Sequence, residues 1–283
     1  MTLPRRHLLA LPLLLAGLPS CARQAARAAS ATTGPALEIG PDGLTQGGLA
    51  LGQVAPGSRV TLDGKPVRVG PDGRFALGFA RDAGPGARLV ATAPDGRSET
   101  RDLAIATREW DIQRLNGLPP AMVSPNAQQL ARIQAERKRI AAARAVDSDL
   151  PFFAGPFAWP ARARISGVYG SQRILNGEPR APHLGLDIAA PTGTPVVAMA
   201  GGRISLAAPL YFTGNTVILD HGHGIASLYA HLSAIDVAEG EMVRQGQRIG
   251  AVGATGRVTG PHLHLGFNWF STALDPALVL QAT

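Results

Sequence analysis

Short apolar and polar alternations, separated by Asp-Gly pairs, are the feature that most limits the folds open to this chain. In its first third, every second residue is apolar along stretches such as 60–62, 67–69 and 75–79. The side chains of a strand alternate between its two faces, so this period predicts half-buried strands. Asp-Gly pairs supply the positive backbone φ that tight hairpins need; they stand at 42–43, 63–64, 72–73 and 95–96. We therefore expect a small antiparallel β-sandwich at residues 36–108.

This predicted sandwich looks like a bacterial immunoglobulin-like (Ig-like) module. It contains no histidine and no cluster of acidic residues, which are the side chains that most metal sites and acid-base catalysts use. We therefore expect it to act as a spacer or docking module.

The first residues have the pattern of an export signal. Arg5 and Arg6 precede an apolar run at 8–18, and small residues with several cleavage options follow. The run is too short to cross a bilayer, which takes about 20 apolar residues, and no later segment is long enough. We expect an export signal at residues 1–31, no transmembrane span in the mature protein, and a periplasmic or secreted location.

The sequence leaves the type of signal open. The paired arginines fit a twin-arginine signal as well as the general secretory type. Cys21 closes a Leu-Pro-Ser-Cys stretch that resembles a lipoprotein processing site, so a lipid anchor at Cys21 is an alternative to full release. Cys21 is also the single cysteine of the chain, which leaves no pair for an internal disulfide.

Composition allows two buried cores but points to no particular polymer as partner. Hydrophobic residues make up 45% of the chain and charged residues 17%, which fits globular domains. The formal net charge of +7 includes four arginines of the expected leader, and no concentrated basic and aromatic patch follows. We therefore expect no nucleic-acid partner.

A helix is expected between the two halves of the chain. Ser124 and Pro125 form a start signal, and apolar residues then recur at helical spacing up to about Ala145. We assign residues 109–158 to this helical linker and residues 159–283 to a second, all-β domain. Glycine and proline separate its expected strands, at 196–199, 216–219, 225–232, 249–252 and 262–267.

Six of the seven histidines lie in the second domain. His262 and His264 are two apart in a strand-like segment, so their side chains project from one face. His183 and Asp187 are four apart, which spans about 13 Å in a straight strand. Gly185 lies between them and permits a turn that brings the two side chains together. Several imidazoles gathered with a carboxylate favour a metal site.

The remaining histidines and isolated aromatic residues favour structural roles. His221 and His223 also lie two apart, but the Asp-His-Gly-His-Gly sequence around them favours a hairpin turn over a second ligand pair. For Trp159, Tyr211 and Trp269, packing in the core is expected rather than lining of a groove.

Three motifs of this domain resemble those of the lysostaphin-type, or LytM-like, zinc metallopeptidases that degrade peptidoglycan. They are His183-Leu-Gly-Leu-Asp187, Tyr229-Ala-His231-Leu-Ser233 and Pro261-His262-Leu-His264. The glycine-rich stretch at 246–256 also looks like the strand and loop that precede the family's last histidines. The resemblance covers residues 159–276 and implies a fold related to the barrel-sandwich folds of lipoyl and biotinyl carriers.

Carried over residue by residue, the resemblance implies one Zn²⁺ per chain, bound by His183, Asp187 and His264. Three ligands of mixed nitrogen and oxygen type leave one position open for water, as in catalytic rather than structural zinc sites. The resemblance also implies that His231 and His262 assist the attack of water, without deciding which of them accepts the proton. The expected function is hydrolysis of peptide cross-links in bacterial peptidoglycan, and the alanine- and arginine-rich composition of the chain, typical of Gram-negative bacteria, favours the D-alanyl-diaminopimelate type.

Three other functions fit parts of the sequence. A catalytically inactive family member that binds cell wall or activates an amidase would usually lack a ligand or a catalytic histidine, and all five residues are present. A carrier domain needs a modified lysine, and the two lysines, Lys65 and Lys138, lie outside this domain. A general protease shares the metal chemistry, and here the export signal and the resemblance favour peptidoglycan.

Overall fold

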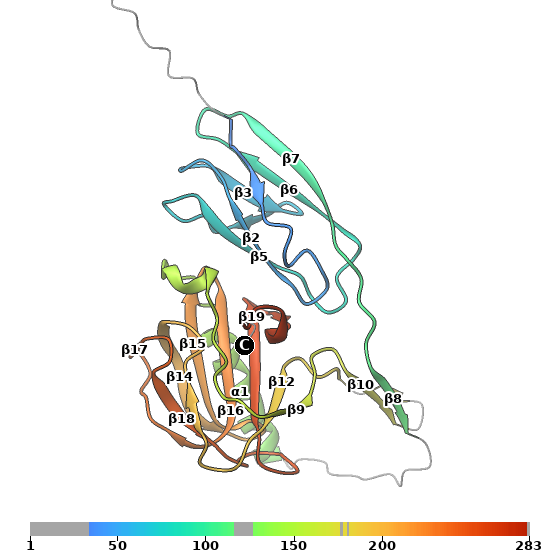
Figure 1. The fold of residues 1–283 in the computed structure, drawn as a ribbon, viewed down its shortest axis with the longest axis vertical. Helices are drawn as coiled ribbons and strands as arrows, with labels where there is room; N and C mark the ends of the chain where they lie inside the picture. Colours follow the sequence, from blue (N-terminus) through green and yellow to red (C-terminus); the bar gives the residue numbers. More distant parts are fainter. Residues whose placement is uncertain (1–33, 116–126, 176–177, 180, 282–283) are drawn as a thin grey trace, which may run out of the picture. The chain divides into compact units, whose positions relative to one another are not determined.

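The computed structural model describes residues 34–115, 127–175, 178–179 and 181–281 (Figure 1). The described chain is mainly β, as predicted, with one α-helix. The expected export signal, including Cys21, and the expected helix start at Ser124 and Pro125 lie outside the described residues. Within the described part, no helix has both the length and the apolar character needed to cross a membrane.

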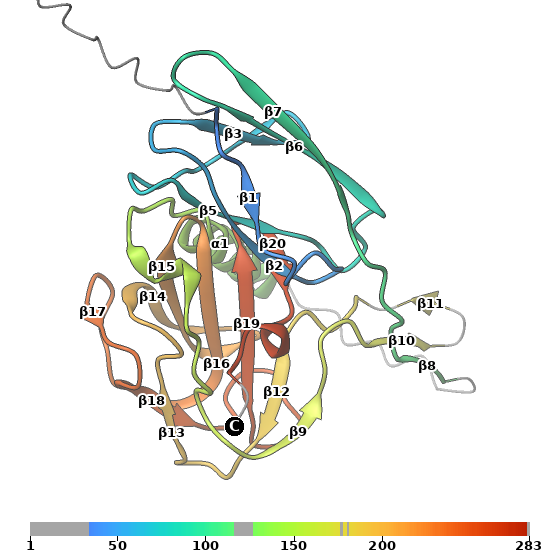
Figure 2. The ribbon, with the colours of Figure 1, turned by 45° about the horizontal axis from the view of Figure 1, so that its top comes forward.

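Seven strands of the described chain between residues 38 and 104 form two antiparallel sheets (Figure 2). The first contains β1 (Glu38–Ile39), β2 (Leu49–Gln53) and β5 (Arg74–Gly78). The second has the order β4-β3-β6-β7, with β3 (Arg59–Leu62), β4 (Lys65–Val67), β6 (Gly86–Thr92) and β7 (Ser98–Ala104). Both sheets contribute buried side chains to one apolar cluster, among them Phe75, Leu77 and Leu89. The two sheets therefore pack face to face as the predicted sandwich.

The β3-β4 hairpin shows how the Asp-Gly pairs direct this fold. Leu62 pairs with Lys65, so Asp63 and Gly64 alone form the turn. Their φ angles of 49° and 76° are both positive, as a two-residue turn of type I′ requires. The right-handed twist of the flanking strands favours this turn, which explains why the pair predicts a hairpin.

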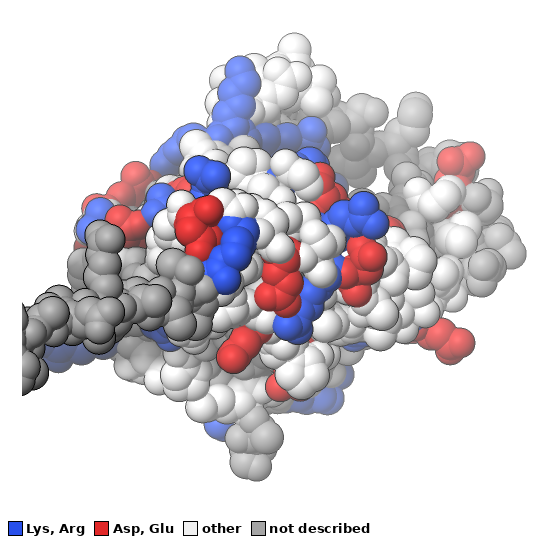
Figure 3. All heavy atoms as spheres, turned by 90° about the horizontal axis from the view of Figure 1, so that it is seen from above, with Lys and Arg blue, Asp and Glu red and all other residues white. Residues whose placement is uncertain are grey.

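Charged side chains of both signs lie next to one another on the face shown in Figure 3. On β6, β7 and the turn between them, Arg88 pairs with Asp102, Arg97 with Asp95 and Arg101 with Glu99. These pairs are well exposed to solvent, so each contributes little to stability. The four-stranded sheet of the sandwich, which contains β6 and β7, therefore presents a surface of mixed charge.

The helix α1 (Ala127–Arg144) packs against β14 (Gly202–Leu210) and β15 (Gly214–Gly222). Ile133 and Ala143 are its buried residues. A separate three-stranded sheet joins β8 (Ile112–Leu115), β10 (Gln172–Leu175) and β11 (Glu178–Pro179), with β8 and β10 parallel.

The second half of the described chain is built on a ten-stranded sheet with the central order β17-β14-β15-β16-β19-β12-β9. β13 and β20 pair with β18 and β19, and β18 also pairs with β16. The remaining bounds are β9 (Arg164–Gly167), β12 (Leu186–Ala189), β13 (Pro195–Val197), β16 (Ile225–Ile235), β17 (Met242–Val243), β18 (Arg248–Val252), β19 (Leu263–Trp269) and β20 (Thr272–Leu274). The central strands β15, β16 and β19 are almost completely buried. They provide a rigid support for side chains at their ends.

The sandwich and the long sheet share apolar contacts. Leu49 and Ala76 of the sandwich belong to the same buried cluster as Leu274 of β20. Arg108 Nη2 donates a hydrogen bond to Asp275 Oδ2 at 2.8 Å, and residues 33–283 form one compact unit. The division into an Ig-like domain at 36–108, a helical linker at 109–158 and a peptidase-like domain at 159–283 stays a prediction.

Candidate metal and catalytic centre

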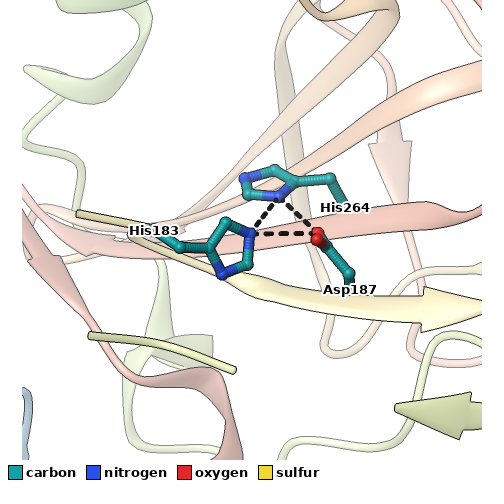
Figure 4. Close-up of side chains that lie close together, drawn as sticks. All are labelled: His183, Asp187 and His264. Carbon is teal, nitrogen blue, oxygen red and sulfur yellow. Dashed lines mark hydrogen bonds and ion pairs between the residues drawn. The ribbon is translucent and has the colours of Figure 1, made fainter. Parts of the chain in front are cut away.

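The structure brings His183, Asp187 and His264 together, as Figure 4 shows. One potential ligand atom from each residue lies within 4.8 Å of the other two. His183 Nε2 is 3.1 Å from Asp187 Oδ1 and 3.2 Å from His264 Nδ1, and His264 Nδ1 is 2.8 Å from the same Oδ1. Two imidazole nitrogens and one carboxylate oxygen that converge in this way form a ligand set that zinc accepts.

The pairing of two strands brings Asp187 and His264 together. β12 and β19 are antiparallel neighbours, and Asp187 is the direct partner of His264 in their register. Side chains at directly opposed positions project from the same face of a sheet at short distance. Residues 77 positions apart in the sequence therefore meet because of one strand register.

His183 lies in the loop before β12, and the backbone of residues 168–171 holds it. Its Nδ1 is 3.0 Å from the carbonyl oxygen of Val168. Its backbone N–H donates to Ser171 O, and the Gly170 N–H donates to His183 O, both at 2.8 Å. When Nδ1–H donates to Val168, the lone pair of the imidazole is on Nε2, the atom that faces Asp187 and His264.

Two glycines leave the space that the ligand side chains occupy. A Cβ atom on Gly185 would lie 2.5 Å from His264 Cε1, and one on Gly167 would lie 2.5 Å from Asp187 Oδ2. The sequence suggested that Gly185 provides conformational freedom, but it is not among the glycines of the described chain with positive φ. Its role is steric: the His264 ring lies where a side chain at 185 would be.

His231 and His262 lie beside this cluster. Their ring centroids are 4.8 Å apart, and that of His231 is 6.2 Å from His264. His231 Nδ1 is 2.9 Å from Thr255 O, and His262 Nδ1 is 2.9 Å from Gly260 O. In both rings Nδ1 is hydrogen-bonded to a backbone carbonyl oxygen. Nε2 is therefore the atom with which each ring can exchange a proton. In His262, this atom is 3.9 Å from Asp187 Oδ1.

Burial and hydrogen bonding shift the pKa values of these groups. Burial opposes ionisation of Asp187, but hydrogen bonds from His183 and His264 outweigh it, so that its pKa lies well below the usual range. Burial also lowers the pKa of His231 to about 4, although the hydrogen bond to Thr255 acts in the opposite direction. His231 is therefore neutral at neutral pH, and Asp187 is ionised.

All five of these side chains line one pocket of about 380 Å³. Arg257, Val258 and Thr259 also line it, and they belong to the loop between β18 and β19, which we call the rim loop (residues 253–262). The sequence motifs did not predict these three residues as part of the site. Their position directly before His262, in a glycine-containing segment, was the available signal.

His221 and His223 lie in a hairpin, as predicted. His221 is fully buried at the end of β15, with Nδ1 2.7 Å from Gly201 O and Nε2 2.8 Å from Ser227 Oγ. His223 occupies the turn between β15 and β16, and its ring stacks on Phe153 at a centroid distance of 3.8 Å. Neither residue lines the pocket.

The isolated aromatic residues stay outside the pocket as well. Trp159 and Trp269 pack against the main apolar cluster. The guanidinium of Arg132, in α1, lies over the Tyr211 ring at 5.8 Å from its centroid. The pocket is therefore lined by histidines, Asp187 and rim-loop residues rather than by these aromatics.

Residues distant in sequence support the loop that holds His183. Arg81, which is only 9% exposed, donates from Nε to Gly170 O at 2.8 Å. Gly170 has a φ of 84°, and a Cβ there would lie 2.0 Å from Trp110 Cε3, so the indole fills the space beside it. The guanidinium groups of Arg81 and Arg108 lie 5.1 and 4.6 Å from the centre of the Trp110 ring. This contact was not predictable from the sequence motifs.

Residues 181–276, which hold the whole cluster, match the model of Peptidase family M23. A crystal structure of an M23 chain from Pseudomonas aeruginosa is 30% identical, with a TM-score of 0.66, over 84% of this chain and 96% of that chain. This chain belongs to peptidase family M23. The resemblance predicted from the three histidine motifs is thus confirmed, and a metallopeptidase family agrees with a cluster that can hold a metal.

Two relatives have names that include an activity. The DD-carboxypeptidase/endopeptidase Mpg of Neisseria meningitidis is 55% identical over 82 residues, 29% of this chain and 19% of that protein. The peptidoglycan DD-endopeptidase ShyA of Vibrio cholerae is 45% identical over 102 residues, 36% of this chain and 24% of that protein. The matches thus span about a fifth to a quarter of the length of the curated relatives.

Proposed function

We propose that this M23 protein is a zinc-dependent endopeptidase that hydrolyses peptide cross-links in bacterial peptidoglycan, of the D-alanyl-diaminopimelate type. The observation that carries the proposal is the convergence of His183, Asp187 and His264 within 4.8 Å, in a pocket that His231 and His262 also line. The name of the relative ShyA, a peptidoglycan DD-endopeptidase, supports peptidoglycan as the substrate, and the name of Mpg supports an endopeptidase activity.

The donor set supports zinc as the metal, with one ion per chain. His183, Asp187 and His264 would hold it, and three ligands of nitrogen and oxygen type suit a catalytic zinc site. When bound, a zinc ion supplies Lewis acidity toward a water molecule and the scissile carbonyl. The hydrogen bond from His183 Nδ1 to Val168 O fixes the orientation of one ligand ring before a metal arrives.

His231 and His262 are the proposed proton carriers. Burial lowers the pKa of His231 to about 4, so its neutral ring can accept a proton at Nε2 from the attacking water at neutral pH. The two rings are 4.8 Å apart at their centroids, close enough for both to serve one reacting group. Protonation of the leaving amine completes hydrolysis, and it requires that one of the two rings returns the proton.

The proposed place of action is the periplasm or the cell exterior. Peptidoglycan lies outside the cytoplasmic membrane, so a protein that cuts it must be exported. The signal at residues 1–31 and the alternative of a lipid anchor at Cys21 rest on the sequence pattern alone.

A pair of variants tests metal binding and proton transfer separately. His264→Ala removes a ligand, so we expect bound zinc and release of cross-linked fragments from purified sacculi to fall together. His231→Ala removes a proton carrier, so we expect zinc content to persist while turnover falls by at least about 100-fold. Zinc is measured by elemental analysis and turnover by chromatography of the released muropeptides.

His223→Asn is the matched control, because His223 lies outside the pocket; it should retain both zinc and turnover. Loss of zinc in His231→Ala, or zinc-independent cleavage by the wild type, would contradict the assignment. Mass spectrometry of the digest identifies the bond, and shortened glycans with intact cross-links would exclude an endopeptidase.

A catalytically inactive wall-binding or amidase-activating protein is not favoured. Such a protein has no need for a complete set of ligands and proton carriers, and all five residues are present and line one pocket. Hydrolysis of sacculi by the purified, zinc-loaded wild type separates the two functions, since a pure binder or activator releases nothing alone.

A further inference from the structure

Arg257 introduces a positive charge at the candidate centre that the proposed hydrolysis does not use. Among the described residues that line the pocket, it is the one lysine or arginine. Asp187, the one carboxylate of the same set, is directed at His183 and His264. The guanidinium therefore does not pair with the carboxylate of the cluster, and it is available to bind a group of the substrate.

The backbone that carries Arg257 is fixed on both sides. Arg257 N–H donates to Phe212 O at 2.9 Å. The preceding Gly256 has a φ of 77°, and a Cβ there would lie 2.4 Å from Gly214 N. Thr255 accepts from His231 Nδ1 through its carbonyl oxygen and donates from Oγ1 to Leu232 O. The same short segment thus orients His231 and positions Arg257.

The side chain of Arg257 is oriented, and no acidic side chain among the described residues pairs with it. Its guanidinium carbon lies 4.5 Å from the centre of the Phe212 ring, a stacking contact that leaves the N–H groups at the edge of the plane available. None of the ion pairs formed by the described residues includes Arg257. Because Arg257 is exposed, a ligand can reach its N–H groups without displacing an acidic side chain of the described residues.

The chemistry of the guanidinium points to a carboxylate. Its planar array of N–H donors matches the two oxygens of a carboxylate, and such bidentate pairs are stronger than neutral hydrogen bonds. In a D-alanyl-diaminopimelate cross-link, the carbon attached to the scissile amide nitrogen carries a free carboxylate. An amide inside a glycine bridge has no such group next to it.

We propose that Arg257 binds the carboxylate adjacent to the scissile amide and so selects cross-links whose amine side carries that charge. The inference rests on the proposed function of the same pocket and adds its substrate class. Arg257 is then a specificity-determining residue on the leaving-group side, while His183, Asp187 and His264 hold the metal.

Two matched peptides test this inference. Each contains a D-alanyl-diaminopimelate bond, and they differ only in whether the carboxylate next to that bond is free or converted to a carboxamide. We expect the zinc-loaded wild type to cleave the free acid with a kcat/KM about 10- to 100-fold higher, the range of one charge-assisted hydrogen bond. In Arg257→Gln this ratio should fall to near one, with most of the change in KM, and Arg257→Lys should restore part of it.

Arg162→Gln is the control, because Arg162 is exposed on the same half of the chain but outside the pocket; it should keep the wild-type ratio. Equal cleavage of both peptides by the wild type would overturn the role of Arg257 and leave the endopeptidase function standing. Calorimetric binding of the amine-side fragment gives a readout without cleavage. The inference is supported if the wild type binds the free acid more tightly than the carboxamide and Arg257→Gln loses this preference. It is overturned if the wild type and Arg257→Gln bind the free acid with equal affinity.

Discussion

At the scale of single residues, Gly167 and Gly185 leave the space that the candidate ligands occupy, because glycine has no side chain. The resemblance to the zinc metallopeptidases implied that His183, Asp187 and His264 bind one ion, and the structure brings these three side chains together. The spacing of motifs along the sequence does not show how much room surrounds each position in the folded protein. The steric roles of Gly167 and Gly185 therefore could not be predicted. Arg257 escaped prediction for a related reason: its place on the pocket depends on how the rim loop folds back onto Phe212.

Gly185→Ala tests this steric role. The added Cβ would lie 2.5 Å from His264 Cε1 and 2.7 Å from Leu265 O, so the His264 ring must shift from its present position. We expect zinc affinity to fall by at least about tenfold, because three ligands bind well only when their geometry is correct. Competition with a chromogenic chelator measures the affinity.

Gly260→Ala is the control for this substitution, since nothing lies within 4 Å of a Cβ at that position. It should keep the wild-type affinity. Unchanged affinity in Gly185→Ala would mean that the ring does not need the space.

At the scale of elements, alternation predicted the existence of the strands better than their partners. The expected strands at 216–219 and 225–232 fall within β15 and β16, and the one at 262–267 overlaps β19 from Leu263 onward, with His262 just outside it. The register that opposes Asp187 to His264 depends on which strands become neighbours, and hydrophobic period carries no information about that choice. The contact of Trp110 with the loop at 168–171 was unpredictable for the same reason, since it joins distant elements.

Trp110→Ala tests whether this contact supports the candidate centre. Without the indole, Gly170 loses the ring that lies against it, and the loop that holds His183 through Val168 O gains freedom. We expect zinc affinity to fall several-fold, because more of the binding free energy is used to order the ligand. The same chelator competition measures this change.

Trp159→Ala removes an equally large ring that packs on the main apolar cluster instead. It should lower the melting temperature with little effect on zinc affinity. If the two variants lose zinc affinity equally, the effect of Trp110 is general destabilisation rather than support of the loop.

At the scale of the whole molecule, one hydrogen-bonded chain of polar groups runs through the long sheet. His221 Nε2 lies 2.8 Å from Ser227 Oγ, which is 3.0 Å from Tyr229 Oη, and the Met199 N–H donates to that oxygen at 2.9 Å. His221 Nδ1 is 2.7 Å from Gly201 O, so both nitrogens of this buried ring have a hydrogen-bond partner. The sequence predicted a structural role for this histidine, but only the fold reveals the partners.

This buried histidine makes stability depend on pH. Burial lowers the pKa of His221 from 6.5 to about 4, so the unfolded chain binds more protons than the folded protein between these values. The free energy of unfolding should therefore fall as the pH drops from 6.5 toward 4, by up to roughly 3 kcal/mol from this group. Urea unfolding at a series of pH values measures the slope.

His221→Gln removes the titrating group and should flatten that slope in this window, whatever its effect on absolute stability. Contributions from the pocket histidines are common to both proteins and cancel in the comparison. An identical slope in the two proteins would show that His221 is not the group that titrates.

The two ends of the rim loop are joined to each other, because Gly253 and His262 pair as an isolated bridge. Its middle, at Arg257, Val258 and Thr259, faces the pocket but supplies none of the three candidate ligands. An engineer who wishes to retarget cleavage to another type of cell-wall bridge should therefore randomise these three positions and leave the ends intact. Such libraries would vary the choice of bond while the hydrolytic apparatus keeps its geometry.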